Sequence, residues 1–217
     1  MAMGTMGFAR GNISTRELEI AEVTTFEVIW SDTKHDSTGI KESTAFFKPI
    51  NVPAEFHCLG YYCQRNTSSM APTTPTLGTL IHGSLLVAKA SKITLDEAIG
   101  ETLGNIDLNI ITKKKPLERP VDYKLIWSND MIRWNRKCRT LPFFWLPLAP
   151  EGYSPLGYAV TCTSVKPCMC EVMCVRSDLT VSCKIADELW STTTCDYYRN
   201  STNNTFSVWA MHPCSIG

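Results

Sequence analysis

An internal repeat is the sequence feature that most constrains how this chain folds. The segment that begins at Phe26 matches the segment that begins at Tyr123, and the matched positions lie 97 or 98 residues apart. The nine identical pairs are Ile29 and Ile126, Trp30 and Trp127, Ser31 and Ser128, Phe46 and Phe144, Pro49 and Pro147, Pro53 and Pro150, Leu59 and Leu156, Gly60 and Gly157, and Tyr61 and Tyr158. This many identities in one order indicate a duplication, and therefore a fold that contains two related units.

Each copy opens with alternating apolar and polar residues. The alternation runs from Phe26 to Trp30 in the first copy and from Val121 to Trp127 in the second. A period of two predicts a β-strand with one buried face, and the two tryptophans are then expected in the core. The prolines that follow cannot donate to a ladder, so they predict strand ends or turns. We expect each copy to end in a short strand carrying Leu-Gly-Tyr, whose glycine permits a bulge or a close backbone approach.

The segment between the copies has a different character. Asn66 to Thr79 is rich in Ser, Thr and Pro, which is typical of a loop, and Thr79 to Ala90 is strand-like again. Thr94 to Glu97 fits a capping box and predicts one short helix before Gly104. The basic run Lys113 to Lys115 is either a solvated loop or a contact with an anionic surface.

The overall charge is balanced, with 21 basic and 21 acidic residues among 217. A general nucleic-acid binder is therefore disfavoured. No apolar stretch reaches the roughly 20 residues that a spanning helix needs, and the N-terminal segment does not fit a secretory signal. Ten cysteines and sequons at Asn12, Asn66, Asn200 and Asn203 favour an oxidising compartment instead. We expect a cytoplasmic or peripheral membrane protein, and a secreted mature form stays open.

The second copy carries a family resemblance. Its segments, in order, are 120–128, 144–153, 156–158, 166–167 and 174–180. They resemble the plant and fungal family named after vacuolar protein sorting protein sixty-two. The resemblance extends from about Phe26 to Gly217 and is more specific in the second copy than in the first. Members of the family are usually longer than this chain.

The resemblance implies a β-prism-like fold, in which short sheets pack about a pseudo-threefold axis. We therefore expect an all-β chain with few or no helices, forming a single β-prism-like domain over residues 1–217. This domain contains two related units at about 23–90 and 120–217. Function is then sought in the pieces that the repeat does not match, 66–115 and 162–195.

Cysteines cluster in the second half of the chain. Cys168 and Cys170, followed by Cys174 and Cys183, match poorly the paired ligand spacing of a structural zinc site. No metal and no cofactor is expected. A disulfide between Cys174 and Cys183, stapling neighbouring strands, is one possibility, and buried thiols are the other.

A few residues are candidates for ligand contact. The charged residues within the resembling segments are Asp122, Arg176 and Asp178. A charge that follows a strand more often caps it or pairs with a neighbour. The better surface candidate is Trp134 between Arg133 and Arg136, because an amphipathic aromatic beside cations suits a headgroup or a glycan.

The sequence lacks the motifs of the common catalytic centres. Its four histidines are scattered, and no nucleophile elbow, phosphate loop or dinucleotide fingerprint is present. We therefore expect a non-enzymatic module that binds glycans or membrane lipid headgroups. One alternative is a membrane-active defence or insecticidal-type toxin, either pore-forming or part of a two-component system with a second protein. It depends on whether 66–91 forms an amphipathic hairpin. The other is an intracellular vacuolar-trafficking adaptor.

Overall fold

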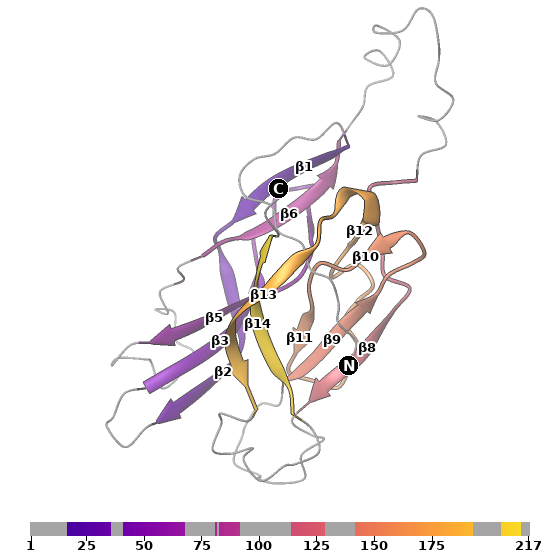
Figure 1. The fold of residues 1–217 in the computed structure, drawn as a ribbon. Coiled ribbons are helices and arrows are strands. Elements are labelled where there is room, and N and C mark those ends of the chain that lie inside the picture. Colours follow the sequence, from indigo (N-terminus) through magenta and orange to yellow (C-terminus); the bar gives the residue numbers. More distant parts are fainter. Residues whose placement is uncertain are drawn as a thin grey trace, which may run out of the picture.

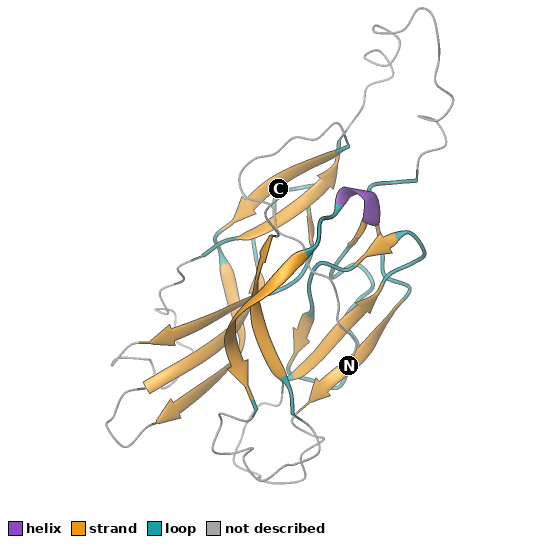
Figure 2. Cartoon of the chain, viewed as in Figure 1, coloured by secondary structure: helices purple, strands orange, loops and turns teal. Residues whose placement is uncertain are grey.

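The chain folds almost entirely into short antiparallel strands (Figures 1 and 2). The computed structural model describes residues 17–35, 41–67, 81, 83–91, 114–128, 142–192 and 205–213. The strands are β1 (Leu18–Val23), β2 (Phe26–His35), β3 (Lys41–Pro49), β4 (His57–Cys58), β5 (Tyr62–Thr67), β6 (Leu85–Ala90), β7 (Leu117–Glu118), β8 (Asp122–Ser128), β9 (Phe143–Leu148), β10 (Tyr153–Ser154), β11 (Ala159–Thr161), β12 (Cys174–Arg176), β13 (Cys183–Ser191) and β14 (Ser207–Pro213). Within these residues the helical structure is the 3₁₀ turn η2 (Ser177–Leu179). The all-β expectation is confirmed.

The two halves of the chain form sheets with the same strand order. The first half forms one sheet in the order β1-β6-β4 and another in the order β2-β3-β5. The second half forms sheets in the orders β7-β12-β10 and β8-β9-β11. Each order follows from the other when every strand number is raised by six. This correspondence extends the units upstream to Leu18 and Leu117, and it leaves the pair β13-β14 without a counterpart.

A β-bulge lies at the same place in both halves. The ladder between β2 and β3 shifts after Val28, and the ladder between β8 and β9 shifts after Leu125. Each bulge brings the following tryptophan opposite a phenylalanine, and these pairs are Trp30 with Phe46 and Trp127 with Phe144. The extra residue, Ile29 or Ile126, locally increases the twist of its strand. It thereby sets the direction in which the following tryptophan side chain points.

Three sheets share one aromatic core. Its buried members come from β2, β3, β8, β9, β11 and β13, and they are Trp30, Phe46, Trp127, Phe144, Val160 and Trp190. Phe206 and Val208, in and just before β14, pack against them. Figure 1 shows β13 and β14 crossing the sheets of both halves. The prediction that the repeated tryptophans lie in the core is confirmed, since Trp30 and Trp127 are both buried.

A second apolar cluster joins the two smaller sheets. Leu18 of β1 and Ala88 of β6 pack with Leu117 of β7 and Val175 of β12. The repeated leucines, Leu59 and Leu156, contact the same cluster. Each small sheet therefore buries its apolar face against the other.

The repeated glycines meet backbone to backbone. A Cβ on Gly60 would lie 2.7 Å from Cα of Gly157, and the reverse substitution would meet Gly60 equally closely. Beside this contact the amide of Tyr61 donates to the carbonyl of Tyr158 at 3.0 Å. The predicted close approach is found. The predicted short strand is wrong, because each Leu-Gly-Tyr lies just before a strand, β5 or β11. At this point the two segments contact each other through their glycine backbones instead of through a strand ladder.

Several sequence predictions fall on residues outside the described part. These are the short helix after Thr94, the core of the Ser/Thr-rich loop and Lys113. The described end of segment 66–91 forms β6, which is the central strand of its sheet and buries Val87 and Ala88. Among the described residues no helix has the length and apolar character needed to cross a membrane.

We predict that Gly60→Ala destabilises the protein by about 1 to 3 kcal/mol, because the new methyl group must push two backbones apart. Gly157→Ala should cost a similar amount. Once one methyl group has separated the backbones, the second costs less, so the double variant should lose less stability than the sum of the two. Urea unfolding of all three variants measures this coupling.

The matched control is Gly152→Ala. Gly152 has φ of 85°, and the nearest atom to its added Cβ would be the flexible end of Lys114 at 3.5 Å. This variant should show backbone strain of about 1 kcal/mol without coupling to Gly60→Ala. Additive losses for the two contacting glycines would contradict the prediction.

Candidate functional site

The β13-β14 hairpin uses its two faces differently. Trp190 and Val208 are paired across the ladder and face the aromatic core. Side chains alternate along a strand, so Trp209 projects to the opposite face. Its indole is 42% exposed, whereas Trp190 is 2% exposed. The hairpin therefore buries one tryptophan and presents another to solvent.

The outward face of the hairpin combines apolar and acidic groups. Glu188 pairs with Trp209, and Ile185 pairs with Met211. Residues paired in this way project to the same side, with Cβ atoms about 4.5 to 5.5 Å apart. Ile185 is 56% exposed, which is unusual for an apolar residue within a strand. We call the group Ile185, Glu188, Trp209 and Met211 the hairpin face.

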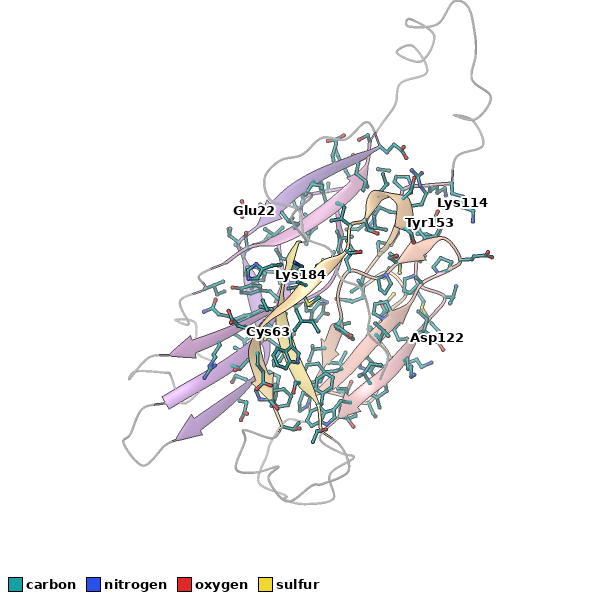
Figure 3. All side chains as sticks on the ribbon, viewed as in Figure 1. Glu22, Cys63, Lys114, Asp122, Tyr153 and Lys184 are labelled. Atoms are coloured by element: carbon teal, nitrogen blue, oxygen red, sulfur yellow. The ribbon has the colours of Figure 1, made fainter. Side chains whose placement is uncertain are left out.

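The charges around the hairpin face are mixed. Asp187 precedes Glu188 and is exposed, while Lys184 and His212 pair with each other at the far end of the ladder and are also exposed. Figure 3 labels Lys184 on β13. Among the described residues of the hairpin, Glu188 lies beside Trp209 and Lys184 lies at the other end, so this part of the hairpin has no cationic excess.

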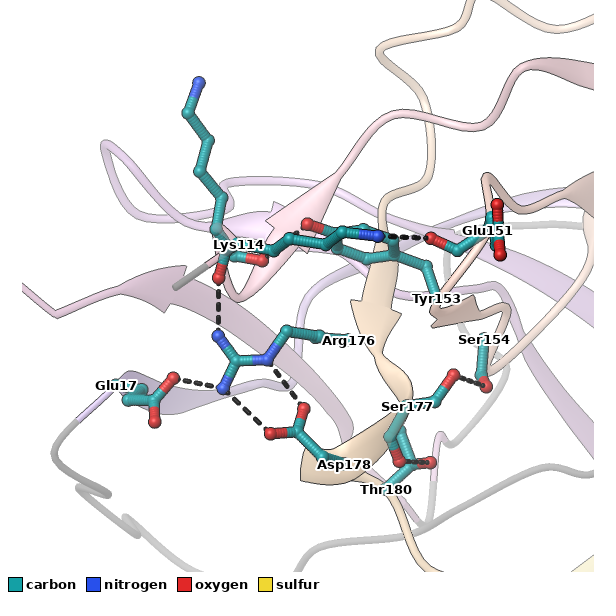
Figure 4. A network of polar contacts seen from close by, with 10 residues as sticks. Glu17, Lys114, Glu151, Tyr153, Ser154, Arg176, Ser177, Asp178 and Thr180 are labelled. Atoms are coloured by element: carbon teal, nitrogen blue, oxygen red, sulfur yellow. Dashed lines mark hydrogen bonds and ion pairs between the residues drawn. The ribbon is translucent and has the colours of Figure 1, made fainter. Parts of the chain in front are cut away.

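Arg176, the last residue of β12, lies at the centre of a polar network (Figure 4). Its Nε donates to Oδ1 of Asp178 at 2.6 Å, and one terminal nitrogen donates to both Asp178 and Glu17. The other terminal nitrogen donates to the carbonyl of Lys114 at 2.5 Å. Arg176 and Asp178 are thus brought together by the structure. Because these contacts use the guanidinium donors internally, the network has a structural role and is a poor ligand site.

The network joins the start of each half. Glu17 lies just before β1 and Lys114 just before β7, while Arg176 ends β12. The amide of Arg176 also donates to the carbonyl of Pro116 at 2.9 Å, and the hydroxyl of Tyr153 donates to the carbonyl of Lys115 at 2.7 Å. The hydrogen bonds to Asp178 and Glu17 raise the pKa of Arg176, so its guanidinium group stays protonated.

Asp122 lies apart from this network. Its carboxylate accepts from Nζ of Lys166 at 2.7 and 2.9 Å and from the amide of Tyr123 at 2.7 Å. The hydrogen bond from Lys166 has the largest effect in lowering the pKa of Asp122, and the hydrogen bond from the Tyr123 amide lowers it further. Figure 3 labels Asp122 beside β8. The carboxylate is exposed but already paired.

A third polar cluster connects the two halves. The hydroxyl of Tyr61 donates to Oε1 of Glu171 at 2.6 Å, and Nζ of Lys48 lies 2.5 Å from the same oxygen. Burial and the nearby carboxylate raise the pKa of Tyr61, so its hydroxyl stays protonated and donates. Glu171 belongs to the turn that follows Cys168, so this turn is tied to the first half of the chain.

The disulfide between Cys174 and Cys183, one of the two possibilities that the sequence leaves open, is not formed in this structure. Both residues are thiols. Cys174 is in β12, which pairs with β7 and β10, whereas Cys183 is in β13, which pairs with β14. The two strands are consecutive in sequence but belong to different sheets. Among the described residues no group of three or more His, Cys, Asp or Glu side chains is placed to hold a metal ion.

Trp134, Arg133 and Arg136 lie outside the described residues. Sequence reasoning missed the hairpin face. Trp209 is visible in the sequence only as an aromatic in a short apolar run, 206–209, in which either of two alternating faces might be buried. The signal that decides between them is the pairing of Val208 with Trp190, which is a long-range contact.

Comparison with known proteins identifies a family and a solved structure of similar fold. The family model described as vacuolar protein sorting-associated protein 62 matches residues 2–217. No curated protein matches the chain. Among solved structures, the crystal structure of GNIP1Aa from Chromobacterium piscinae is similar, with a TM-score of 0.53 and 18% identity. The match covers 90% of this chain and 30% of that one, and at this identity it shows the fold alone.

We predict that Arg176→Lys lowers the free energy of unfolding by about 2 to 4 kcal/mol, because an ammonium group cannot replace a buried, forked set of donors. Asp178→Asn should cost less than about 1 kcal/mol, since the Asp178 side chain is 55% exposed. Chemical denaturation of both variants measures the difference. Equal losses would show that the network does not depend on the guanidinium.

Proposed function

Because the chain belongs to the vacuolar protein sorting-associated protein 62 family, we propose that it is a non-enzymatic binding module that recognises glycans through the hairpin face. The observation that carries the proposal is Trp209, whose indole is 42% exposed within a strand whose neighbouring residue packs in the core. The inner residues fix the backbone, so the outer tryptophan is held on a rigid support.

The chemistry of the hairpin face suits a sugar. An exposed indole offers a flat apolar surface on which the apolar face of a pyranose ring stacks. Sugar hydroxyls are donors, and carboxylates accept hydrogen bonds with both oxygens. Glu188, directly across the ladder from Trp209, supplies such an acceptor. Ile185 and Met211 extend the apolar surface along the hairpin.

The same charges favour a glycan over an anionic lipid surface. Binding to anionic headgroups is driven by clusters of basic residues. Glu188 lies beside the tryptophan of the hairpin face and repels such headgroups. A neutral glycan requires no cationic patch. Lipid headgroup binding is therefore the outcome against which the glycan proposal is tested.

We expect Trp209→Ala to weaken glycan binding by at least about tenfold, since the central aromatic of a small binding surface typically dominates its affinity. Glu188→Gln should weaken it less, because the amide keeps one acceptor oxygen. The labelled full chain is applied to an array of neutral and acidic glycans, and affinities for the positive glycans are then measured by titration calorimetry.

Val121→Ala is the matched control. Val121 is 64% exposed beside β8, away from the hairpin face, and should leave binding unchanged. The thermal midpoint of Trp209→Ala should stay near that of the original chain, because the removed side chain is partly solvated. Flotation with phosphatidylcholine and phosphatidylserine vesicles tests the competing ligand. Vesicle binding without glycan binding, or glycan binding that survives Trp209→Ala, would overturn the proposal.

A further inference from the structure

Two exposed cysteines lie in one short turn. Cys168 and Cys170 flank Met169 in the connection between β11 and β12, and both are exposed. Met169 instead packs toward the cluster around the buried ring of Tyr123. The intervening side chain therefore points inward while the two thiols remain at the surface.

The backbone of this turn is held in place. The carbonyl of Cys168 accepts from the amide of Glu171 at 2.9 Å and from the hydroxyl of Tyr123 at 3.2 Å. Glu171 is itself bonded to Tyr61 and Lys48. Both ends of the Cys168–Glu171 turn are thus fixed to strands of the larger sheets, so the two thiols keep a defined relation to each other.

The two thiols interact directly. The amide of Cys170 donates to Sγ of Cys168 at 3.3 Å. A hydrogen bond between the two side chains has the largest effect in lowering the pKa of Cys168, and the hydrogen bond from the Cys170 amide lowers it further. The same side-chain contact raises the pKa of Cys170. Arg119 favours and Glu171 opposes the Cys168 thiolate. The contact therefore favours the thiolate form at Cys168 and the thiol form at Cys170.

Other described thiols have the opposite character. Burial raises the pKa of Cys58 and of Cys174 to about 11 in each case, and it raises the pKa of Cys63 and Cys162 as well. A thiol in this state is a poor nucleophile at neutral pH. These four residues are expected to react much more slowly than Cys168.

A metal site explains this pair less well than a redox site does. Structural zinc takes four ligands, and no group of three candidate ligands is present among the described residues. A thiolate beside a thiol is instead the arrangement of a nucleophilic and a resolving cysteine.

We propose that Cys168 and Cys170 form a dithiol that undergoes exchange with low-molecular-weight disulfides such as oxidised glutathione. The Cys168 thiolate attacks one sulfur of the disulfide, and one glutathione thiolate leaves. Cys170 gives up its proton and attacks Sγ of the mixed disulfide, which releases the second glutathione and closes the Cys168–Cys170 bond. Counted from the dithiol with both sulfurs protonated, the protein loses two electrons and two protons, and the glutathione disulfide gains them to become two thiols.

The experiment uses the full chain, reduced and then equilibrated without oxygen in glutathione buffers of increasing oxidised fraction. Samples are quenched with acid, alkylated and mapped by peptide mass spectrometry. Cys168 and Cys170 should lose their reactivity toward the alkylating agent together, in a peptide lighter by two hydrogens. Cys170→Ser should accumulate a glutathione adduct on Cys168. Cys168→Ser should react at least about tenfold more slowly, because the low-pKa nucleophile is gone.

Cys162→Ser is the matched control, since Cys162 is a half-buried thiol that donates to the carbonyl of Ile29 at 2.9 Å. It should exchange like the original chain. Thermal midpoints of the reduced variants show whether each variant folds. The mapping of the original chain tests the proposal even where a variant does not fold. A stable glutathione adduct on Cys168 in the original chain would overturn the proposal. Two cysteines that stay independently alkylated in the most oxidising buffer would do the same.

Discussion

One tryptophan, Trp190, contacts the central aromatic side chains of both halves of the chain. The Trp190 ring lies 5.5 Å from the ring of Trp30 and 5.5 Å from that of Trp127, in an edge-to-face arrangement with the first at 85°. Each half presents a tryptophan and a phenylalanine to the centre, and the two phenylalanines meet at 5.0 Å. Two three-stranded sheets leave these rings partly open to solvent. The β13-β14 pair closes the core. The indole Nε1 of Trp190 also donates a hydrogen bond to Oδ2 of Asp32 at 2.8 Å.

This constraint explains where the candidate function lies. Because β13 and β14 must direct Trp190 and Val208 inward, their alternate residues have to point outward. An outward residue has no packing role, so Trp209 and Ile185 are free to differ from the residues that a core would require. An exposed tryptophan at such a position contributes little to the packing of the core, and the proposed ligand contact is therefore placed there.

The sequence predicted local features well and long-range contacts poorly. Strand alternation found β2 and β8, and the repeat placed both tryptophans in the core, because a period of two and a matched motif are local signals. The partner of Gly60 was not predictable, since it is another copy of the same motif 97 residues away. The sequence left open whether Cys174 and Cys183 form a disulfide for a related reason. The two residues are close in sequence, but a change of sheet separates them.

The position of the cysteine pair follows from the same division between constrained and unconstrained residues. The described residues of the connection between β11 and β12 do not contribute to the shared aromatic core. Connections of this kind tolerate change while the strands around them stay fixed. The second half has used this freedom to add two thiols in a turn anchored by Tyr123 and Glu171. The repeated strands thus provide a rigid frame, and reactive or ligand-binding groups are found where the repeat imposes no packing.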